Sequence, residues 1–226
     1  MIEIRNVSKS YGNLNVLQNL SLSIQEGAVT AIVGPSGAGK TTLLRILGSL
    51  EHPDTGSVVY DETDIFSLSE RQLADFRCRN IGFIFQFHEL LPEFSARENV
   101  AMPALIKGDS RKEALHNADT MLTRLGLGER LSHRPDEMSG GERQRTAIAR
   151  ALINHPKVIL ADEPTGSHDS HNRDEIQSIL HNLSLKEGHT VVMVTHDPSL
   201  AAIADFIVSM ADGKIISVEK NLQVSD

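Results

Sequence analysis

A glycine-rich segment of nine residues constrains the fold of this chain more than any other feature. It reads Gly34-Pro35-Ser36-Gly37-Ala38-Gly39-Lys40-Thr41-Thr42 and fits the pattern Gly-x-x-x-x-Gly-Lys-Ser/Thr, whose backbone N–H groups surround phosphate oxygens. The apolar run Val29–Val33 comes directly before it, and the helix-forming stretch Thr42–Leu47 follows. A strand, a tight turn and a helix in this order direct successive backbone N–H groups and the helix N-terminus to one point, where an anion can bind. The segment therefore predicts a nucleotide-phosphate site, with Lys40 at the β- and γ-phosphates and the Thr41 hydroxyl at Mg²⁺.

A second apolar run ends in two carboxylates and supplies what a phosphate loop lacks. Val158-Ile159-Leu160-Ala161 is followed by Asp162 and Glu163. Alone, such a run is typical of many strands that end in a solvated acidic turn. Together with the phosphate loop it predicts hydrolysis, in which Asp162 holds Mg²⁺ and Glu163 orients and deprotonates the attacking water.

The distribution of strand and helix signals predicts an α/β fold. Strands are expected at Ile2–Asn6, Leu17–Ile24, Val29–Val33, Ser57–Tyr60, Ile81–Phe85, Val158–Asp162 and Val191–Thr195, with a terminal hairpin of Phe206–Met210 and Ile215–Val218 around Asp212-Gly213. Helices are expected at Thr41–Leu50, Ser110–Leu125, Glu142–Ile153 and Asp174–Leu185. We predict one domain with a P-loop NTPase (RecA-like) core at residues 1–86 and 157–226, an N-terminal antiparallel β subdomain, and an α-helical subdomain inserted at residues 87–156.

Composition excludes several classes of protein. The 226 residues carry a net charge of −8, so a general affinity for nucleic acid is not indicated. Cys78 is the only cysteine, which excludes an intrachain disulfide and favours a small apolar filler. The apolar runs are far shorter than the roughly 20 residues that span a bilayer, and the N-terminus lacks a signal-peptide pattern. We therefore expect a cytosolic protein that contacts a membrane only through a partner.

One predicted helix has an unusual beginning. Ser139 and Glu142 have capping-box spacing, which is sufficient to explain an efficient helix start. Gly140 and Gly141 between them cost about 1 kcal/mol each in helix propensity. That cost is explained if the backbone must come close to a ligand, and exposed N–H groups beside a serine hydroxyl suit a γ-phosphate.

At this point the chain resembles the ATPase subunits of ABC transporters over essentially its whole length. Ser139–Arg145 is similar to the signature motif of that family. The family's other motifs follow in order: Tyr11 is placed to stack on adenine, Gln86 to form the Q-loop, Asp169 the D-loop, and His196 the switch histidine. An alternative for Tyr11 is a plain turn aromatic beside Gly12.

The resemblance implies a mechanism. ABC ATPases form a head-to-tail homodimer in which the P-loop of one copy faces residues 139–142 of the other, with ATP and Mg²⁺ between them. Gln86 would join Thr41 and Asp162 as a metal ligand, and Lys40, Gln86, Glu163 and His196 would be catalytic. This chain departs from the family at Ser167-His168-Asp169, where leucine usually precedes the aspartate, so His168 is a candidate for pH sensitivity near the dimer interface.

A longer stretch of sequence indicates which kind of transporter this ATPase serves. Phe85–Phe94, Ser95–Pro103 and His133-Arg134-Pro135 resemble the ATPase subunits of bacterial lipoprotein-releasing transporters, which lie at the cytoplasmic side of the inner membrane. Phe87–Phe94 would then receive an integral membrane subunit, although its aromatic residues alternatively pack the helical insert against the core. ATPases of macrolide or antimicrobial-peptide exporters and of a cell-division complex share the pattern and are alternatives. A nucleotide-binding regulator is a remote one, since Glu163 and His196 are both present.

Overall fold

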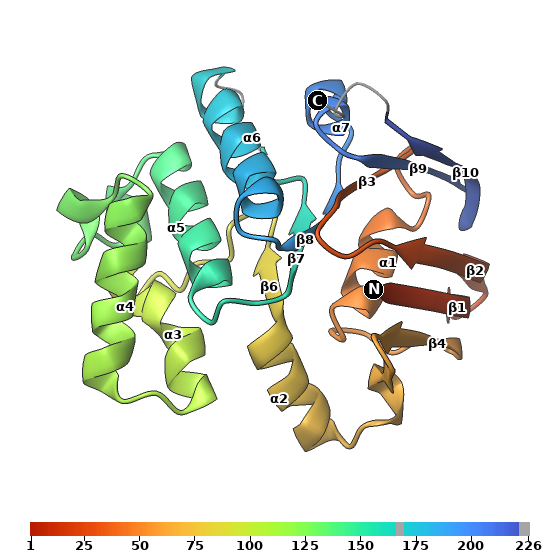
Figure 1. The fold of residues 1–226 in the computed structure, drawn as a ribbon, viewed down its shortest axis with the longest axis horizontal. Helices are drawn as coiled ribbons and strands as arrows, with labels where there is room; N and C mark the ends of the chain where they lie inside the picture. Colours follow the sequence, from red (N-terminus) through yellow and green to blue (C-terminus); the bar gives the residue numbers. More distant parts are fainter. Residues whose placement is uncertain (166–169, 222–226) are drawn as a thin grey trace.

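The chain folds around two β-sheets, with helices on both sides of the larger one (Figure 1). The structure is a computed structural model that describes residues 1–165 and 170–221, and only the backbone of residues 170–172. Its α-helices are α1 (Lys40–Leu47), α2 (Glu70–Asn80), α3 (Ala96–Lys107), α4 (Arg111–Arg124), α5 (Gly140–Leu152), α6 (Ser170–Leu185) and α7 (Pro198–Ala202). Short 3₁₀ turns are formed by Ile65–Ser67, Gly128–Arg130 and Pro135–Glu137.

The smaller sheet is antiparallel and has the strand order β2-β1-β4-β5. Its strands are β1 (Ile2–Tyr11), β2 (Leu14–Ile24), β4 (Thr55–Tyr60) and β5 (Thr63–Asp64). β1 continues well past the predicted end at Asn6. That residue has a φ of +52°, and the pairing with β2 shifts register between Ile4 and Val7, so an irregularity bends the strand without ending it.

The larger sheet has the order β10-β9-β3-β8-β7-β6 and is parallel except for the edge strand β10. Its strands are β3 (Val29–Val33), β6 (Ile81–Ile84), β7 (Val158–Asp162), β8 (Thr190–Val194), β9 (Phe206–Ala211) and β10 (Lys214–Lys220). Asp212 and Gly213 have φ values of +49° and +74°, which confirms the predicted hairpin turn. The predicted α/β fold class is confirmed.

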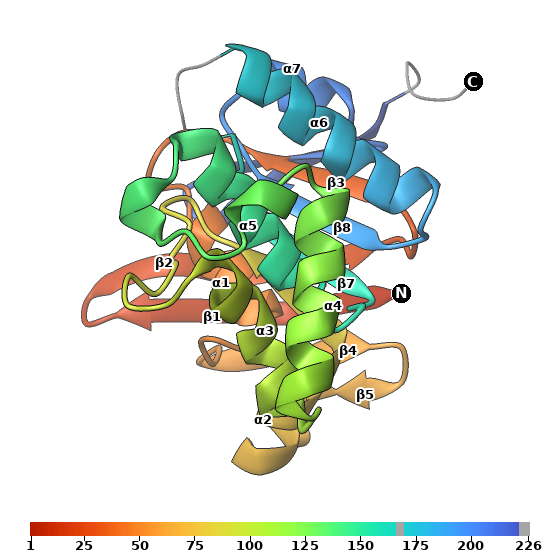
Figure 2. The same ribbon diagram turned by 90° about the vertical axis from the view of Figure 1, so that its left-hand side faces the viewer.

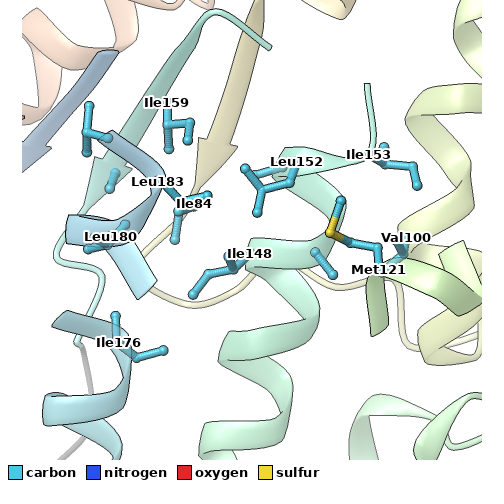
Figure 3. Close-up of a cluster of buried hydrophobic side chains, with 14 of the residues drawn as sticks. Ile84, Val100, Met121, Ile148, Leu152, Ile153, Ile159, Ile176, Leu180 and Leu183 are labelled. Carbon is cyan, nitrogen blue, oxygen red and sulfur yellow. The ribbon is translucent and has the colours of Figure 1, made fainter. Parts of the chain in front are cut away.

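Alternate residues of the central strands serve two different cores. Val158 and Leu160 of β7 join the buried cluster that contains α1 and the antiparallel sheet. Ile159 and Ala161 point to the opposite face and join the cluster with α3 to α6 (Figure 3). A strand buried on both faces reads as a continuous apolar run, which is why β7 and β8 were predictable.

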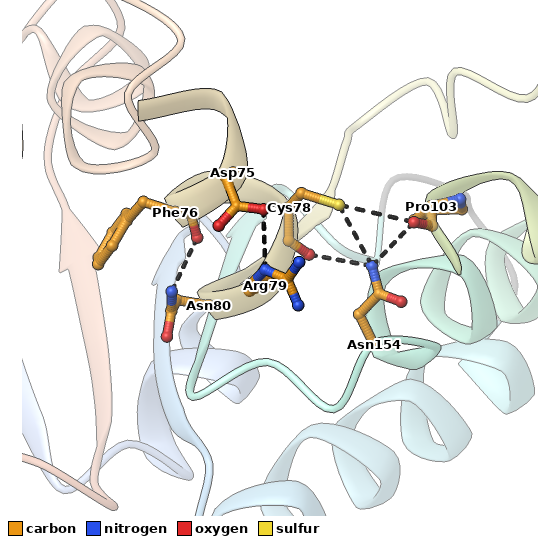
Figure 4. A network of polar contacts seen from close by, with 7 residues as sticks. All are labelled: Asp75, Phe76, Cys78, Arg79, Asn80, Pro103 and Asn154. Carbon is orange, nitrogen blue, oxygen red and sulfur yellow. Dashed lines mark hydrogen bonds and ion pairs between the residues drawn. The ribbon is translucent and has the colours of Figure 1, made fainter. Parts of the chain in front are cut away.

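α3, α4 and α5 form a group on one side of the molecule, which faces the viewer in Figure 2. Asn154, just after α5, ties this group to α2 by donating from Nδ2 to the carbonyls of Cys78 and Pro103, each at 3.0 Å (Figure 4). Burial raises the pKa of the Cys78 thiol, which favours its inert thiol form.

Some boundaries differ from the prediction. The helix expected at Thr41–Leu50 ends at Leu47, because Gly48 caps it and Ser49 has a φ of +53°. α6 begins at Ser170 rather than Asp174. α2 was not predicted, since Leu73 is the only fully buried residue within it and its apolar periodicity is weak.

Candidate nucleotide-binding site

The candidate site lies where several parallel strands end. β3, β7 and β8 are neighbours in the sheet, so their carboxyl ends meet at one edge. The P-loop follows β3, Asp162 ends β7 and Glu163 follows it, and His196 comes two residues after β8. Such an edge is where open α/β sheets bind ligands.

The P-loop backbone requires glycine at two positions. Gly34 has a φ of +148°, and a Cβ there would lie 2.1 Å from the Met210 carbonyl oxygen. Gly39 has a φ of +91°, and a Cβ there would lie 2.7 Å from the Val16 carbonyl oxygen. Gly39 also caps α1 without a side-chain hydrogen bond, so the first N–H groups of that helix are available to an anion.

Lys40 and Thr41 start α1 and face the loop and the strand ends. The Lys40 ammonium donates to the carbonyls of Gly34 and Pro35 at 2.8 and 2.9 Å. Thr41 donates its hydroxyl to Asp162 Oδ1 at 3.3 Å. Burial raises the pKa of Asp162, although the Thr41 hydrogen bond acts in the opposite direction. A cation beside Asp162 would favour the charged carboxylate.

Glu163 and His196 form a pair at the same edge. His196 Nδ1 lies 2.8 Å from Glu163 Oε1, and the His196 N–H donates to Oε2 at 3.3 Å. Glu163 takes a left-handed φ of +45°, unusual for a residue with a side chain, and its side chain is only 13% exposed. Strained backbone of this kind is common where a side chain must be aimed at a ligand.

A cavity of about 500 Å³ brings most of the predicted residues together. It is lined by Leu14, Val16, Gly34, Ser36, Gly37, Ala38, Gly39, Lys40, Thr41, Thr42, Gln86, Asp162, Glu163, Val194 and His196. Leu14 and Val16 were not predicted. Both belong to β2, where Leu14 is 66% exposed although its side chain is apolar, and nothing in the sequence distinguishes them from other apolar strand residues.

Tyr11 lies outside this lining. Its hydroxyl contacts Glu51, and the Lys9 ammonium lies 5.6 Å from the centre of its ring. Tyr11 is paired with Leu14 at the end of the β1–β2 hairpin, and Leu14 lines the cavity. Its role at adenine stays a prediction.

Ser139–Glu142 also lies outside the cavity, at the start of α5. The predicted capping box is confirmed: Ser139 Oγ accepts from the Glu142 N–H at 3.3 Å, and Glu142 accepts from the Ser139 N–H at 2.8 Å. This backbone hydrogen bond and the Arg130 side chain lower the pKa of Glu142 to about 2. The cap therefore contributes its full stability above about pH 4.5 and loses it as the pH falls towards 2. Asp169 and His168 lie outside the described residues.

Comparison of this sequence with known protein families identifies the family to which it belongs. Residues 17–166 match the family described as "ABC transporter". The chain belongs to the ABC transporter family. As an ABC ATPase it binds and hydrolyses ATP, as the ATP-binding domains of this family do.

Individual relatives of this ABC ATPase cover nearly its whole length. The lipoprotein-releasing system ATP-binding protein LolD of Bacteroides thetaiotaomicron is 54% identical over 215 residues, 95% of this chain and 99% of the relative. LolD of Porphyromonas gingivalis is 53% identical over 217 residues, 96% of this chain and 99% of the relative. Among solved structures, the ATP-binding cassette MJ0796 in a dimeric post-hydrolysis state bound to ADP and Pi has a TM-score of 0.91 and 38% identity, with both chains fully covered. A second dimeric structure of MJ0796, described as a bacterial ABC transporter cassette, also has a TM-score of 0.91, at 39% identity and the same coverage.

The residues of the ABC ATPase site suit Mg²⁺ bound together with ATP. Thr41 and Asp162 offer hard oxygen ligands, which Mg²⁺ prefers. Within residues 1–165 and 170–221, no cluster of three or more His, Cys, Asp or Glu side chains is placed to hold a metal ion. A Mg²⁺ ion here would take its remaining ligands from Gln86, which lines the same cavity, and from phosphate oxygens and water. None of the helices in those ranges is long and apolar enough to cross a membrane.

Proposed function

We propose that this chain is the ATP-hydrolysing motor subunit of a transporter that releases lipoproteins from the inner membrane. The observation that carries the hydrolytic part is the Glu163–His196 pair, which lies over the same cavity as Lys40, Thr41 and Asp162. The lipoprotein-releasing part is supported by the relatives, which are named for that system.

The proposed roles of the site residues follow from their chemistry. Glu163 accepts a proton from the attacking water, and His196 orients Glu163 and contacts the γ-phosphate. Lys40 leaves the loop carbonyls for the β- and γ-phosphates. Thr41, Asp162 and Gln86 hold Mg²⁺, which, when bound, neutralises the charge that develops on the phosphates.

We further propose that two copies share each nucleotide. The uncapped start of α1 lies in the cavity, whereas Ser139–Glu142 at the start of α5 lies outside it. A second copy in head-to-tail orientation would bring its own Ser139–Glu142 to the phosphate. The dimeric cassettes to which the chain is similar support this arrangement.

The membrane subunit is proposed to dock at Phe87–Phe94, at the cytoplasmic face of the inner membrane. Phe87 is 78% and Leu91 40% exposed, so two apolar side chains are free to meet a partner. A groove of about 290 Å³ adjoins this segment and is lined in part by Phe85, Ile106 and Arg150. This segment begins the proposed helical subdomain (residues 87–156), which is inserted into the core (residues 1–86 and 157–226).

Glu163→Gln tests the hydrolytic assignment. The variant keeps the shape of the side chain but removes its basicity, so turnover should fall by about 10²–10⁴-fold while ATP still binds. ATPase rate and equilibrium ATP binding are measured on the same preparation. Glu219→Gln, on the exposed edge strand β10, is the matched control and should keep wild-type turnover. Wild-type turnover in Glu163→Gln would contradict the assignment.

Depletion of the protein in cells tests the transported substrate. Lipoproteins destined for the outer membrane should accumulate in the inner membrane, and wild-type protein should restore their release whereas Glu163→Gln should not. Normal lipoprotein distribution after depletion would exclude lipoprotein release and favour one of the exporter or cell-division alternatives.

A further inference from the structure

Helix α6 lies between two parts of the molecule that the proposed mechanism uses. In Figure 1 it runs between α5 and α7. Ser139–Glu142 form the N-cap and first turn of α5, and α7 begins just after His196. Its residues Ile176, Leu180 and Leu183 are buried in the core cluster beneath it (Figure 3). Because they recur at helical spacing, they hold one face of α6 against the sheet.

The two flanks of that apolar face carry polar side chains with different partners. At 100° per residue, Arg173 and Gln177 share one flank, because they are four residues apart. Glu175 lies between them in sequence and therefore projects from the other flank. α6 thus presents polar groups to both of its neighbours.

On the first flank, α6 is joined to the switch segment. Arg173 Nε lies 3.3 Å from Asp197 Oδ2, and Gln177 Nε2 donates to the Ser199 carbonyl at 2.5 Å. Asp197 directly follows His196 and also accepts from the Ser199 N–H at 2.9 Å, which starts α7. The backbone that carries His196 is therefore held to α6 through residues that do not line the nucleotide cavity.

On the second flank, α6 is joined to α5. Arg145 Nη1 donates to Glu175 Oε2 at 2.5 Å, and the Arg145 side chain is only 16% exposed. Arg145 Nε is buried without a hydrogen-bond partner among the described residues. Removal of Glu175 would therefore leave a largely buried guanidinium without its carboxylate, which is costly.

We propose that α6 is a strut that fixes the start of α5 relative to His196, with Arg145, Glu175 and Arg173 as positioning residues for ATP hydrolysis. Arg145 is six residues after Ser139, or about 9 Å along the helix, so a shift of the ion pair moves the helix start directly. The two ends of the strut belong to different composite sites in the proposed dimer: His196 acts on its own chain's nucleotide and Ser139 on the partner's. The proposal rests on the proposed function, and it gives each chain a connection between its two half-sites.

Exchange of the charges tests this connection in the full-length chain. Arg145→Glu and Glu175→Arg should each lower kcat about tenfold, and the double variant should recover to within about threefold of wild type. The affinity of the isolated chain for ATP should change less than about twofold in all three, because the cavity is not altered. Arg173→Ala should lower kcat about threefold. If Arg145→Glu does not fold, Glu175→Gln replaces it, since Gln keeps the acceptor oxygen and loses the charge, and it should still lower kcat.

A control separates positioning from simple stabilisation. Arg79 forms an i, i+4 ion pair with Asp75 on the exposed side of α2. Arg79→Glu should leave kcat within about twofold, since exposed pairs contribute little. Failure of the double variant to recover, or single-variant losses no larger than that of Arg79→Glu, would overturn the strut. Persistent turnover in Glu163→Gln would instead overturn the proposed function, so the two failures are distinguishable.

Discussion

At the residue scale, Asp162 is a side chain that suits a bound cation but lowers the stability of the ligand-free fold. Its carboxylate is held at the end of a buried strand, and burial raises its pKa above the ordinary value. A raised pKa in the folded state means that the ionised form is disfavoured by folding. Without a cation, the charge on Asp162 therefore destabilises the protein above that pKa. The penalty shrinks as the pH falls below it and is gone below the ordinary pKa of an aspartate.

Asp162→Asn should therefore stabilise the nucleotide-free protein at neutral pH. We expect a gain of no more than about 1 kcal/mol, because the side chain is partly exposed to solvent, which corresponds to a rise in Tm of about 2–4 °C at most. The gain should shrink as the pH is lowered, and Mg²⁺-dependent turnover should be lost. Thermal unfolding between neutral and acidic pH, without nucleotide or Mg²⁺, measures it. Asp75→Asn, which removes an exposed ion-paired carboxylate, is the control that should show no gain. A lower Tm for Asp162→Asn at neutral pH would contradict this account.

At the element scale, two helices begin with the same capping box, but only one of them is expected to bind a phosphate. α3 starts with Ser95, whose Oγ accepts from the Glu98 N–H at 3.3 Å, and Glu98 accepts from the Ser95 N–H at 3.0 Å. α5 starts with the same capping box at Ser139 and Glu142. The α3 cap has no glycines, whereas the α5 cap contains Gly140 and Gly141.

The pair Ser95→Ala and Ser139→Ala separates capping from ligand binding. Each should cost about 1 kcal/mol of stability through the lost cap, or about 2–4 °C in Tm. Only Ser139→Ala should also lower kcat, by at least about tenfold, because its hydroxyl is proposed to reach a phosphate. Thermal unfolding and ATPase assays on both variants provide the comparison. Equal kcat values in the two variants would leave α5 with an ordinary helix cap.

At the scale of the whole molecule, local chemistry was predictable from sequence and tertiary surroundings were not. The P-loop, Asp162 and Glu163 could be found because a buried strand, whose apolar run is visible in the sequence, leads into each of them. His196 follows the buried strand β8, but its role came from the resemblance to ABC ATPases. Leu14 and Val16 were missed, since nothing local marks an apolar residue as part of a cavity wall. α2 was missed because its contact with the rest of the protein depends on a few side chains, Leu73 and Phe76 among them. The ion pairs of α6 join residues far apart in the chain, and no sequence pattern indicates them.

The central claim is that two chains together hold one ATP. Lys40→Ala disables the cavity half of each site, and Ser139→Ala disables the α5 half. In a homodimer of either variant both sites contain one damaged half, so each protein alone should be nearly inactive. A mixed dimer contains one site with both halves damaged and one site with both halves intact.

Mixing the two inactive variants tests this claim most directly. At equal concentrations, half of the dimers are mixed and each has one intact site, so ATPase activity should recover to about a quarter of wild type if the sites act independently. The activity is measured before and after mixing at constant total protein concentration. Recovery would show that ATP hydrolysis uses groups from both chains, and an activity that stays at the level of the separate variants would show that it does not.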